Sequence, residues 1–315
     1  LRVSAEEIDA ACERCAPELM EAMELTAERI RRYQESILVP DPEPLEMDGR
    51  LTGVRYTPVD AAGLCVPGAA ASLASSVLMN AVPARVAGVA RLAMVTPPNA
   101  RGRISDDRLA AARVAGVDEI YRVGGSQAVA ALAYGTDTIE PVDFIAGPGN
   151  IFVTLAKRAV FGRVGMDGLP GPSEVVVIAD DSADPAAVAA DLLAQAEHDP
   201  GASILLTPDD ATCRHVLDCL AEQLAELSRA EATKTCLERY SMAVVCSSME
   251  ECIELSDEVA PEHLQITTAD SRDVADQISH AGAIFIGPWT PVACGDYIAG
   301  PSHTLPTSRT ARFSS

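Results

Sequence analysis

Two residues that could bind a metal ion lie one helical turn apart in the segment DLLAQAEHDP, residues 191–200. Gln195 and His198 are three positions apart, so they share one face if this segment is a helix. An imidazole and an amide oxygen, joined by a carboxylate, form a ligand set that suits zinc. Asp296, in a loop-like segment far downstream, is the obvious carboxylate for that set. A histidine near the negative end of a helix is also common without any metal, so both interpretations stay open.

A possible acid–base pair, Glu262 and His263, precedes the strand-like residues LQITT. Adjacent side chains at a strand entrance point in different directions, so these two could serve two sides of one site. A histidine beside a carboxylate can act as a general base near neutral pH. The same residues would also be compatible with a turn that carries a surface pair.

Two Gly-rich turns, VGGSQA at 123–128 and AGPGN at 146–150, follow strand-like residues. Ligands of open α/β sheets bind at such strand ends, and N–H groups at a helix N-terminus attract anions. Neither turn matches the GxGxxG pattern after a strand. Each turn could therefore face a dinucleotide, or could simply connect a strand tightly to a helix.

The elements that must position these residues alternate along the chain. Apolar strands, Gly-rich turns and helices succeed one another between residues 65 and 172, and again from Glu174 to Gly287, which indicates doubly wound parallel sheets. We expect helices over residues 4–36 (capped by Ser4), 71–88, 105–116, 126–133, 150–160, 185–198 (ended by Asp199-Pro200-Gly201), 211–226, 249–259 and 270–282. We expect strands over residues 91–96, 119–123, 144–146, 174–179, 203–207, 241–245, 264–267 and 283–287, with 39–49 and 289–308 as connecting segments.

The composition argues against several partners. Asp and Glu number 46 against 24 Lys and Arg, a formal net charge of −22 over 315 residues, which repels nucleic acid and anionic membranes. No apolar run is long enough to cross a bilayer, and no signal peptide opens the chain. Nine scattered cysteines fit a reducing compartment, so we expect a cytoplasmic protein.

Five motifs, in the order AGPGN…AKR, GPSEVVVIAD, DLLAQAEHDP, APEHLQI and GDYIAGPSHTLPT, carry a resemblance to a known family. They are similar to those of the histidinol dehydrogenases, over essentially the whole chain. The resemblance implies an α/β fold of two incomplete, doubly wound Rossmann-like domains, one inserted into the other, with an N-terminal helix. The inserted, NAD-contacting domain would be residues 65–172, and the outer domain would be 1–64 plus 173–315, which carries the metal and catalytic residues. The family also forms an intertwined homodimer.

The activity implied by the resemblance is oxidation of L-histidinol to L-histidine through L-histidinaldehyde, the last steps of histidine biosynthesis, with two hydride transfers to NAD. One zinc ion per subunit, held by Gln195, His198 and Asp296, would orient the substrate. His263 would be the general base, and Glu262 would activate the water that attacks the aldehyde. Substrate contacts are implied for Ser173, Gln195, His198, His263, Asp296 and His303, and NAD contacts for Cys65, Gln127 and Asn150.

Two features depart from the family pattern. Cys65 stands where the cofactor loop usually carries a tyrosine, which removes a ring that would stack on NAD. The family's C-terminal tail supplies a substrate-binding glutamate and a histidine as fourth zinc ligand, and it has no counterpart up to Ser315. Water or His303 could take the fourth position, or further residues could follow. The alternative functions are a catalytically impaired, ligand-binding homologue and a dehydrogenase for another amino or sulfonated alcohol.

Overall fold

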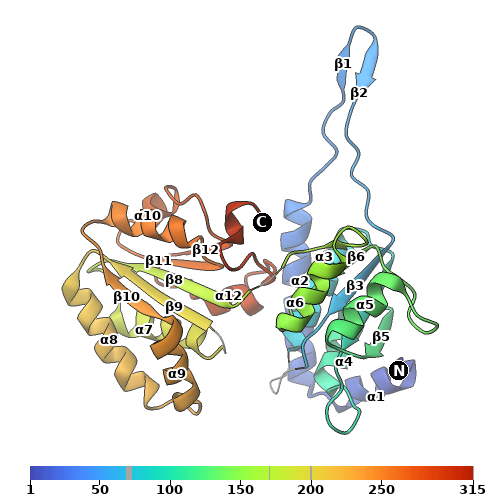
Figure 1. The fold of residues 1–315 in the computed structure, drawn as a ribbon, viewed down its shortest axis with the longest axis horizontal. Coiled ribbons are helices and arrows are strands. Elements are labelled where there is room, and N and C mark those ends of the chain that lie inside the picture. The colour runs from blue at the N-terminus through green and yellow to red at the C-terminus, as the bar shows by residue number, and fades with distance from the viewer. Residues whose placement is uncertain (69–72, 170, 199–200, 315) are drawn as a thin grey trace. The chain divides into compact units, whose positions relative to one another are not determined.

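The computed structural model describes residues 1–68, 73–169, 171–198 and 201–314. The chain divides into two compact units (Figure 1). Unit 1 consists of Leu1–Leu169 with Gly295–Thr304, and unit 2 of Pro170–Cys294 with Leu305–Ser315. The predicted helix break at Asp199-Pro200, and the first two residues of the helix expected over 71–88, lie outside the described residues. Within the described ranges, no helix is long and apolar enough to cross a membrane.

Unit 1 is built on a five-stranded parallel sheet with helices on both faces. Its strands are β3 (Ala61–Cys65), β4 (Arg91–Thr96), β5 (Glu119–Arg122), β6 (Phe144–Ala146) and β7 (Gly165–Met166), in the spatial order β5-β4-β3-β6-β7. One face carries α1 (Ala5–Arg14), α2 (Pro17–Ile37), α3 (Ala74–Val86) and α4 (Asp106–Val114), and the other carries α5 (Ser126–Tyr134) and α6 (Ile151–Val160). This is the strand order of a Rossmann sheet without its last strand.

Unit 2 repeats the same arrangement. Its strands are β8 (Ser173–Ala179), β9 (Gly201–Thr207), β10 (Met242–Val245), β11 (His263–Thr267) and β12 (Ala283–Ile286), in the order β10-β9-β8-β11-β12. Helices α7 (Pro185–Ala196) and α8 (Asp210–Leu224) cover one face, and α10 (Met249–Val259) and α11 (Ser271–Ala275) cover the other. The predicted doubly wound parallel α/β fold is confirmed.

Aliphatic side chains on both faces of each strand explain why these segments form buried parallel sheets. In β4, Leu92 and Met94 pack toward α1–α4, whereas Ala93 and Val95 pack toward α5 and α6. A strand buried on both faces is apolar throughout, and so its sequence is a continuous hydrophobic run rather than an alternating one. The strand predicted over 91–96 is therefore confirmed to the residue.

The predicted single helix over residues 4–36 is wrong, because the segment forms two helices that meet at Pro17. Proline has no N–H to donate and cannot continue a helix, but it fits the first position of a new one. Ala16 accordingly takes an extended conformation, and α2 begins at Pro17. The predicted cap is confirmed, since the Ser4 hydroxyl accepts a hydrogen bond from the Glu7 N–H at 3.3 Å.

Residues 1–64 belong to unit 1. Helix α1 packs on α4, and α2 packs on α3. An ion pair at 2.6 Å from Arg14 to Asp106 joins the first of these contacts. The compact units thus differ from the predicted division, in which 1–64 accompanies 173–315.

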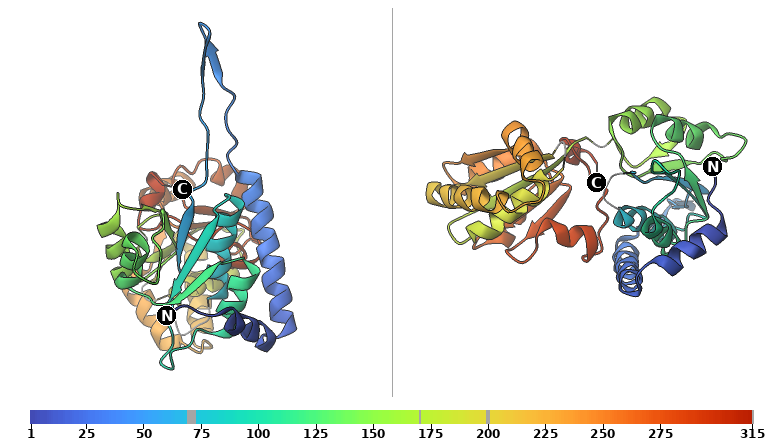
Figure 2. Two further views of the ribbon diagram at one scale, coloured as in Figure 1. Left: turned by 90° about the vertical axis from the view of Figure 1, so that its right-hand side faces the viewer. Right: turned by 90° about the horizontal axis from the view of Figure 1, so that it is seen from below.

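Three short elements also differ from the expected pattern. The helix expected over 270–282 ends at Ala275, because the N–H groups of Ser279 and His280 turn away to the Asp257 carboxylate at 2.9 Å. Helices α9 (Ala230–Tyr240) and α12 (Val292–Tyr297) were not expected, and α12 lies in the segment predicted as a loop. The connector at 39–49 contains β1 (Leu45–Met47), which pairs with β2 (Arg50–Thr52) in a hairpin that projects from unit 1 (Figure 2).

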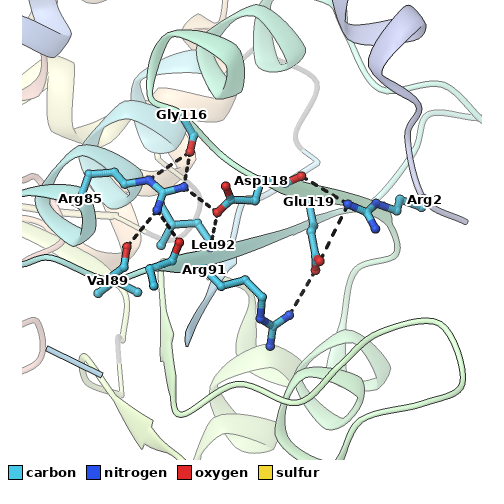
Figure 3. Close-up of polar contacts among 9 residues, drawn as sticks. Arg2, Arg85, Val89, Arg91, Leu92, Gly116, Asp118 and Glu119 are labelled. Carbon is cyan, nitrogen blue, oxygen red and sulfur yellow. Dashed lines mark hydrogen bonds and ion pairs between the residues drawn. The ribbon is translucent and has the colours of Figure 1, made fainter. Parts of the chain in front are cut away.

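A network of arginines and carboxylates ties together the amino ends of β4 and β5 (Figure 3). The Arg85 guanidinium donates to the Gly116 carbonyl and forms an ion pair with Asp118. Arg91 forms a second ion pair with Glu119, at 3.2 Å. These contacts hold the amino ends of the strands, whereas a ligand of such a sheet would bind at the carboxyl ends.

Candidate active site

The predicted catalytic residues of unit 2 lie at the amino ends of two adjacent parallel strands. Ser173 is the first residue of β8 and His263 is the first residue of β11, which pair side by side. Gln195 reaches the same edge because it lies in the last turn of α7, which runs back antiparallel to the strands. Open α/β sheets usually bind ligands at the carboxyl ends, so this site is on the opposite edge of its sheet.

A short chain of hydrogen bonds links three of these residues. The Gln195 side-chain amide donates to Ser173 Oγ at 2.8 Å, and the Ser173 hydroxyl donates to Glu262 Oε2. Gln195 and Glu262 are both buried. Because Ser173 accepts from Nε2, the amide of Gln195 has a defined orientation, in which Oε1 is the atom available to a ligand.

Glu262 and His263 form a close polar pair beside an aromatic ring. Oε2 of Glu262 lies 3.8 Å from His263 Nδ1, and each side chain is only 9% exposed. The His263 ring is 6.0 Å from the ring of Phe285, measured between centroids, on the neighbouring strand β12. The pair therefore places a carboxylate and an imidazole side by side at the start of β11.

Glu174 is a site residue that was not predicted from the sequence. Its Oε1 accepts hydrogen bonds from the backbone N–H of Glu262 at 3.2 Å and of Ser308 at 2.8 Å. Burial raises the pKa of Glu174, and these two backbone hydrogen bonds oppose that rise. Its place directly after Ser173 in GPSE was the signal that could have found it.

His198 lies just beyond the end of α7 and is exposed. Its backbone N–H donates to the Gln195 carbonyl at 3.2 Å, and its ring Nδ1 lies 3.2 Å from the same oxygen. The structure thus brings Gln195 and His198 together at one helix end. Nε2 of the His198 ring points away from this contact and is the nitrogen that could bind a metal.

Asp296 and His303 belong to unit 1 and lie beside each other there. His303 Nδ1 is 3.4 Å from Asp296 Oδ1, and His303 Nε2 is 3.5 Å from the hydroxyl of Ser76 on α3. Ser76 was not predicted. Within the part of the chain that the structure describes, no three His, Cys, Asp or Glu side chains cluster as a metal site.

A pocket of about 360 Å³ lies at the carboxyl ends of the strands of unit 1. Its walls come from the turns after β3, β4, β5 and β6 and from two helices, as follows: Cys65, Val66, Pro67, Gly68, Val95, Pro97, Gly124, Gly125, Ala128, Pro148, Gly149, Asn150 and Val153. The strand order reverses between β3 and β6, which is where Rossmann sheets bind dinucleotides. Among the described lining residues are two of the three predicted NAD contacts, Cys65 and Asn150.

The predicted NAD contacts differ in their surroundings. Asn150 caps α6, since its Oδ1 accepts hydrogen bonds from the N–H groups of Phe152 and Val153 at 3.1 and 3.2 Å. Gln127 is exposed in the first turn of α5. Burial raises the pKa of the Cys65 thiol to about 11, so that it stays protonated at neutral pH.

Comparison with known proteins agrees with this geometry. A family model described as histidinol dehydrogenase matches residues 1–315. The histidinol dehydrogenases of Thermosynechococcus vestitus and Rhodospirillum rubrum are 51% and 53% identical to this chain, and each match covers 100% of this chain and 73% of the relative. The crystal structure of histidinol dehydrogenase from Elizabethkingia anophelis matches with a TM-score of 0.96 and 38% identity, covering 100% of this chain and 73% of that one. The chain therefore belongs to the histidinol dehydrogenase family of oxidoreductases.

Proposed function

We propose that this chain oxidises L-histidinol to L-histidine in two NAD-linked steps, with one zinc ion per subunit. The observation that carries the proposal is the hydrogen-bonded series Gln195–Ser173–Glu262 beside His263. This series combines a metal-ligand type, an orienting hydroxyl and an acid–base pair at one sheet edge. Those are the groups that oxidation of an alcohol, hydration of an aldehyde and a second oxidation require.

Three side chains fit zinc by the chemistry of their donor atoms. Gln195 offers Oε1 because its Nε2 is engaged by Ser173. His198 offers Nε2, and Asp296 offers a carboxylate. By the family resemblance, these three would belong to a set whose fourth ligand is a histidine of the C-terminal tail. Zinc held by them would orient the imidazole and amine of histidinol.

The chain's own residues would move the protons. His263 would take the hydroxyl proton of the alcohol, and later the proton of the hydrated aldehyde. Glu262, whose carboxylate is oriented by the Ser173 hydroxyl, would take a proton from the attacking water. Histidinol, two NAD⁺ and one water would thus give histidine, two NADH and three protons.

The pocket of unit 1 fits a dinucleotide in position and in backbone shape. A Cβ at Gly124 would lie 2.7 Å from Pro97, and one at Gly149 would lie 2.4 Å from Val153, so these turns have no room for a side chain. A bare backbone can approach a pyrophosphate closely. NAD bound there, in contact with Cys65, Gln127 and Asn150, would accept a hydride in each step.

Assembly and location follow from the resemblance and from composition. We expect a homodimer, as in the family. All nine cysteines are free thiols, which supports a reducing, cytoplasmic location. The net charge of −22 supports a protein that binds a small-molecule substrate and neither nucleic acid nor an anionic membrane.

The test is to supply zinc, NAD and L-histidinol to the protein as its gene encodes it, and to follow NADH. His263→Asn should lower turnover by roughly 10²–10⁴-fold through loss of the base. His215→Asn, which alters an exposed histidine of α8, is the matched control and should leave turnover unchanged. Absence of NADH from zinc-loaded wild-type protein would overturn the proposal, and unchanged turnover in His263→Asn would overturn the role of that base.

A further inference from the structure

Lys157 is a fully buried cation next to the pocket of unit 1. It is one of only two lysines in the chain, lies on α6, and has a side-chain exposure of 0%. Its ammonium group donates to the Gly147 carbonyl at 2.6 Å and to Asp167 Oδ1 at 2.7 Å. Nothing in the proposed chemistry uses this group, so its burial needs another explanation.

Asp167 binds the same glycine, so Lys157 and Asp167 together form a clamp on Gly147. Its Oδ2 accepts a hydrogen bond from the Gly147 N–H at 2.7 Å. The ion pair of Lys157 and Asp167 therefore holds both polar backbone groups of Gly147. Gly147 has a φ of +103°, and a Cβ there would lie 2.2 Å from the Cys65 carbonyl oxygen, so the turn passes directly over the end of β3.

The residues that follow Gly147 form one wall of the pocket. Pro148, Gly149 and Asn150 line it, and Asn150 then starts α6. A buried ion pair is a poor way to gain stability, because apolar residues of similar volume often do as well or better. What such a pair does provide is a fixed orientation of the groups to which it is hydrogen-bonded.

We propose that Lys157 and Asp167 are positioning residues that hold the Gly147–Asn150 turn in the form that accepts the dinucleotide. The proposal rests on the assignment of this pocket to NAD. It assigns no proton transfer and no contact with the substrate to either residue. Loss of the clamp should therefore weaken NAD binding, whereas the KM for histidinol should stay close to that of the wild type.

Variants at the clamp separate positioning from simple stability. Lys157→Met keeps the length of the side chain but leaves Asp167 without its ion-pair partner. The double variant Lys157→Met/Asp167→Asn removes both charges, so it should recover much of the lost thermal stability. If the clamp positions the turn, the double variant still binds NAD weakly, by about tenfold or more. Lys234→Met, at the exposed lysine of α9, is the matched control and should bind NAD like the wild type.

Two measurements decide the proposal. The first is the Kd of NAD by calorimetry, and the second is hydrogen exchange of the Gly147 amide without NAD, which should be slow in wild type and fast in the variants. Variants with a fast-exchanging amide but a wild-type Kd would overturn the positioning role. If the loss of NAD affinity across the variants is proportional to their loss of thermal stability, the clamp is purely structural. That result would also overturn the proposal. Failure of wild-type protein to bind NAD would instead overturn the pocket assignment, and the proposal with it.

Discussion

Ser173 accepts a hydrogen bond from the side-chain amide of Gln195 at 2.8 Å. The same hydroxyl donates to Glu262, so one small side chain orients a proposed zinc ligand and a proposed catalytic carboxylate together. This relationship joins residues 67 positions apart, from Gln195 to Glu262, through a residue at the start of β8.

Ser173→Ala should impair zinc binding and turnover together. Without the hydroxyl, the Gln195 amide can rotate and Glu262 loses the hydrogen bond from Ser173, and loss of such supporting partners typically lowers metal affinity or activity by roughly 10–100-fold. Metal analysis after dialysis against a graded chelator, together with kcat/KM for histidinol, measures both effects. Ser182→Ala, at an exposed serine of the same unit, should change neither. Wild-type zinc retention and kcat/KM in Ser173→Ala would show that neither Gln195 nor Glu262 depends on Ser173 for its function.

Glu174 should make stability fall as the pH rises. Burial raises its pKa above the ordinary value of 4.5, so the folded protein holds this proton more tightly than the unfolded chain does. Its contribution to stability is therefore fully present below pH 4.5 and is lost as the pH rises through the raised folded value. Glu174→Gln cannot ionise, so it should gain stability relative to wild type across that window. Urea unfolding at a series of pH values tests this, and parallel curves for the two proteins would contradict it.

Cys65 should resist alkylation at neutral pH although it lines the pocket. Its pKa is raised to about 11 by burial, and the thiol rather than the thiolate is then present. Cys12 and Cys294, which are partly exposed, should react first. Timed treatment with iodoacetamide, followed by peptide mass spectrometry, gives the order. Cys65 reacting as fast as Cys12 would mean that this end of β3 is open and the thiol ionised.

Arg85 should matter more to stability than a surface arginine. It hydrogen-bonds to three backbone carbonyls, of Val89, Ala90 and Gly116, and pairs with Asp118 (Figure 3). Arg85→Ala should lower the free energy of unfolding by about 1–3 kcal/mol, since three backbone carbonyls lose a charged donor. Arg214→Ala breaks only an exposed ion pair on α8 and should lower it by about 0.3–0.5 kcal/mol. Equal effects in thermal or urea unfolding would refute this distinction.

The sheets could be predicted from sequence because their strands are buried on both faces. Runs such as RLAMVT and EVVVIA carry the signal locally, and Gly-rich turns mark their ends. The sequence predicts one N-terminal helix instead of two, because the hydrophobic periodicity of a helix continues across Pro17. The early end of α11 depends on Asp257, which lies on another helix, so no local pattern could reveal it.

The sequence could predict most of the residues that belong to the candidate site, but not the contacts between them. Motifs gave Ser173, Gln195, Glu262 and His263, and the structure adds the hydrogen bonds that order them. Glu174 and Lys157 were missed because their roles are contacts with backbone groups, of Ser308 and Gly147 respectively. Such contacts leave no spacing rule in a sequence, and the one signal for Glu174 was its place after Ser173 in GPSE.

The number of NADH molecules formed per histidinol tests the central claim most directly. With excess NAD and zinc-loaded protein, limiting L-histidinol should yield two NADH and one histidine, with no accumulated aldehyde. Glu262→Gln should slow the aldehyde step more than the alcohol step, since only the former needs an activated water. One NADH per histidinol with release of the aldehyde, or no NADH at all, would contradict the account.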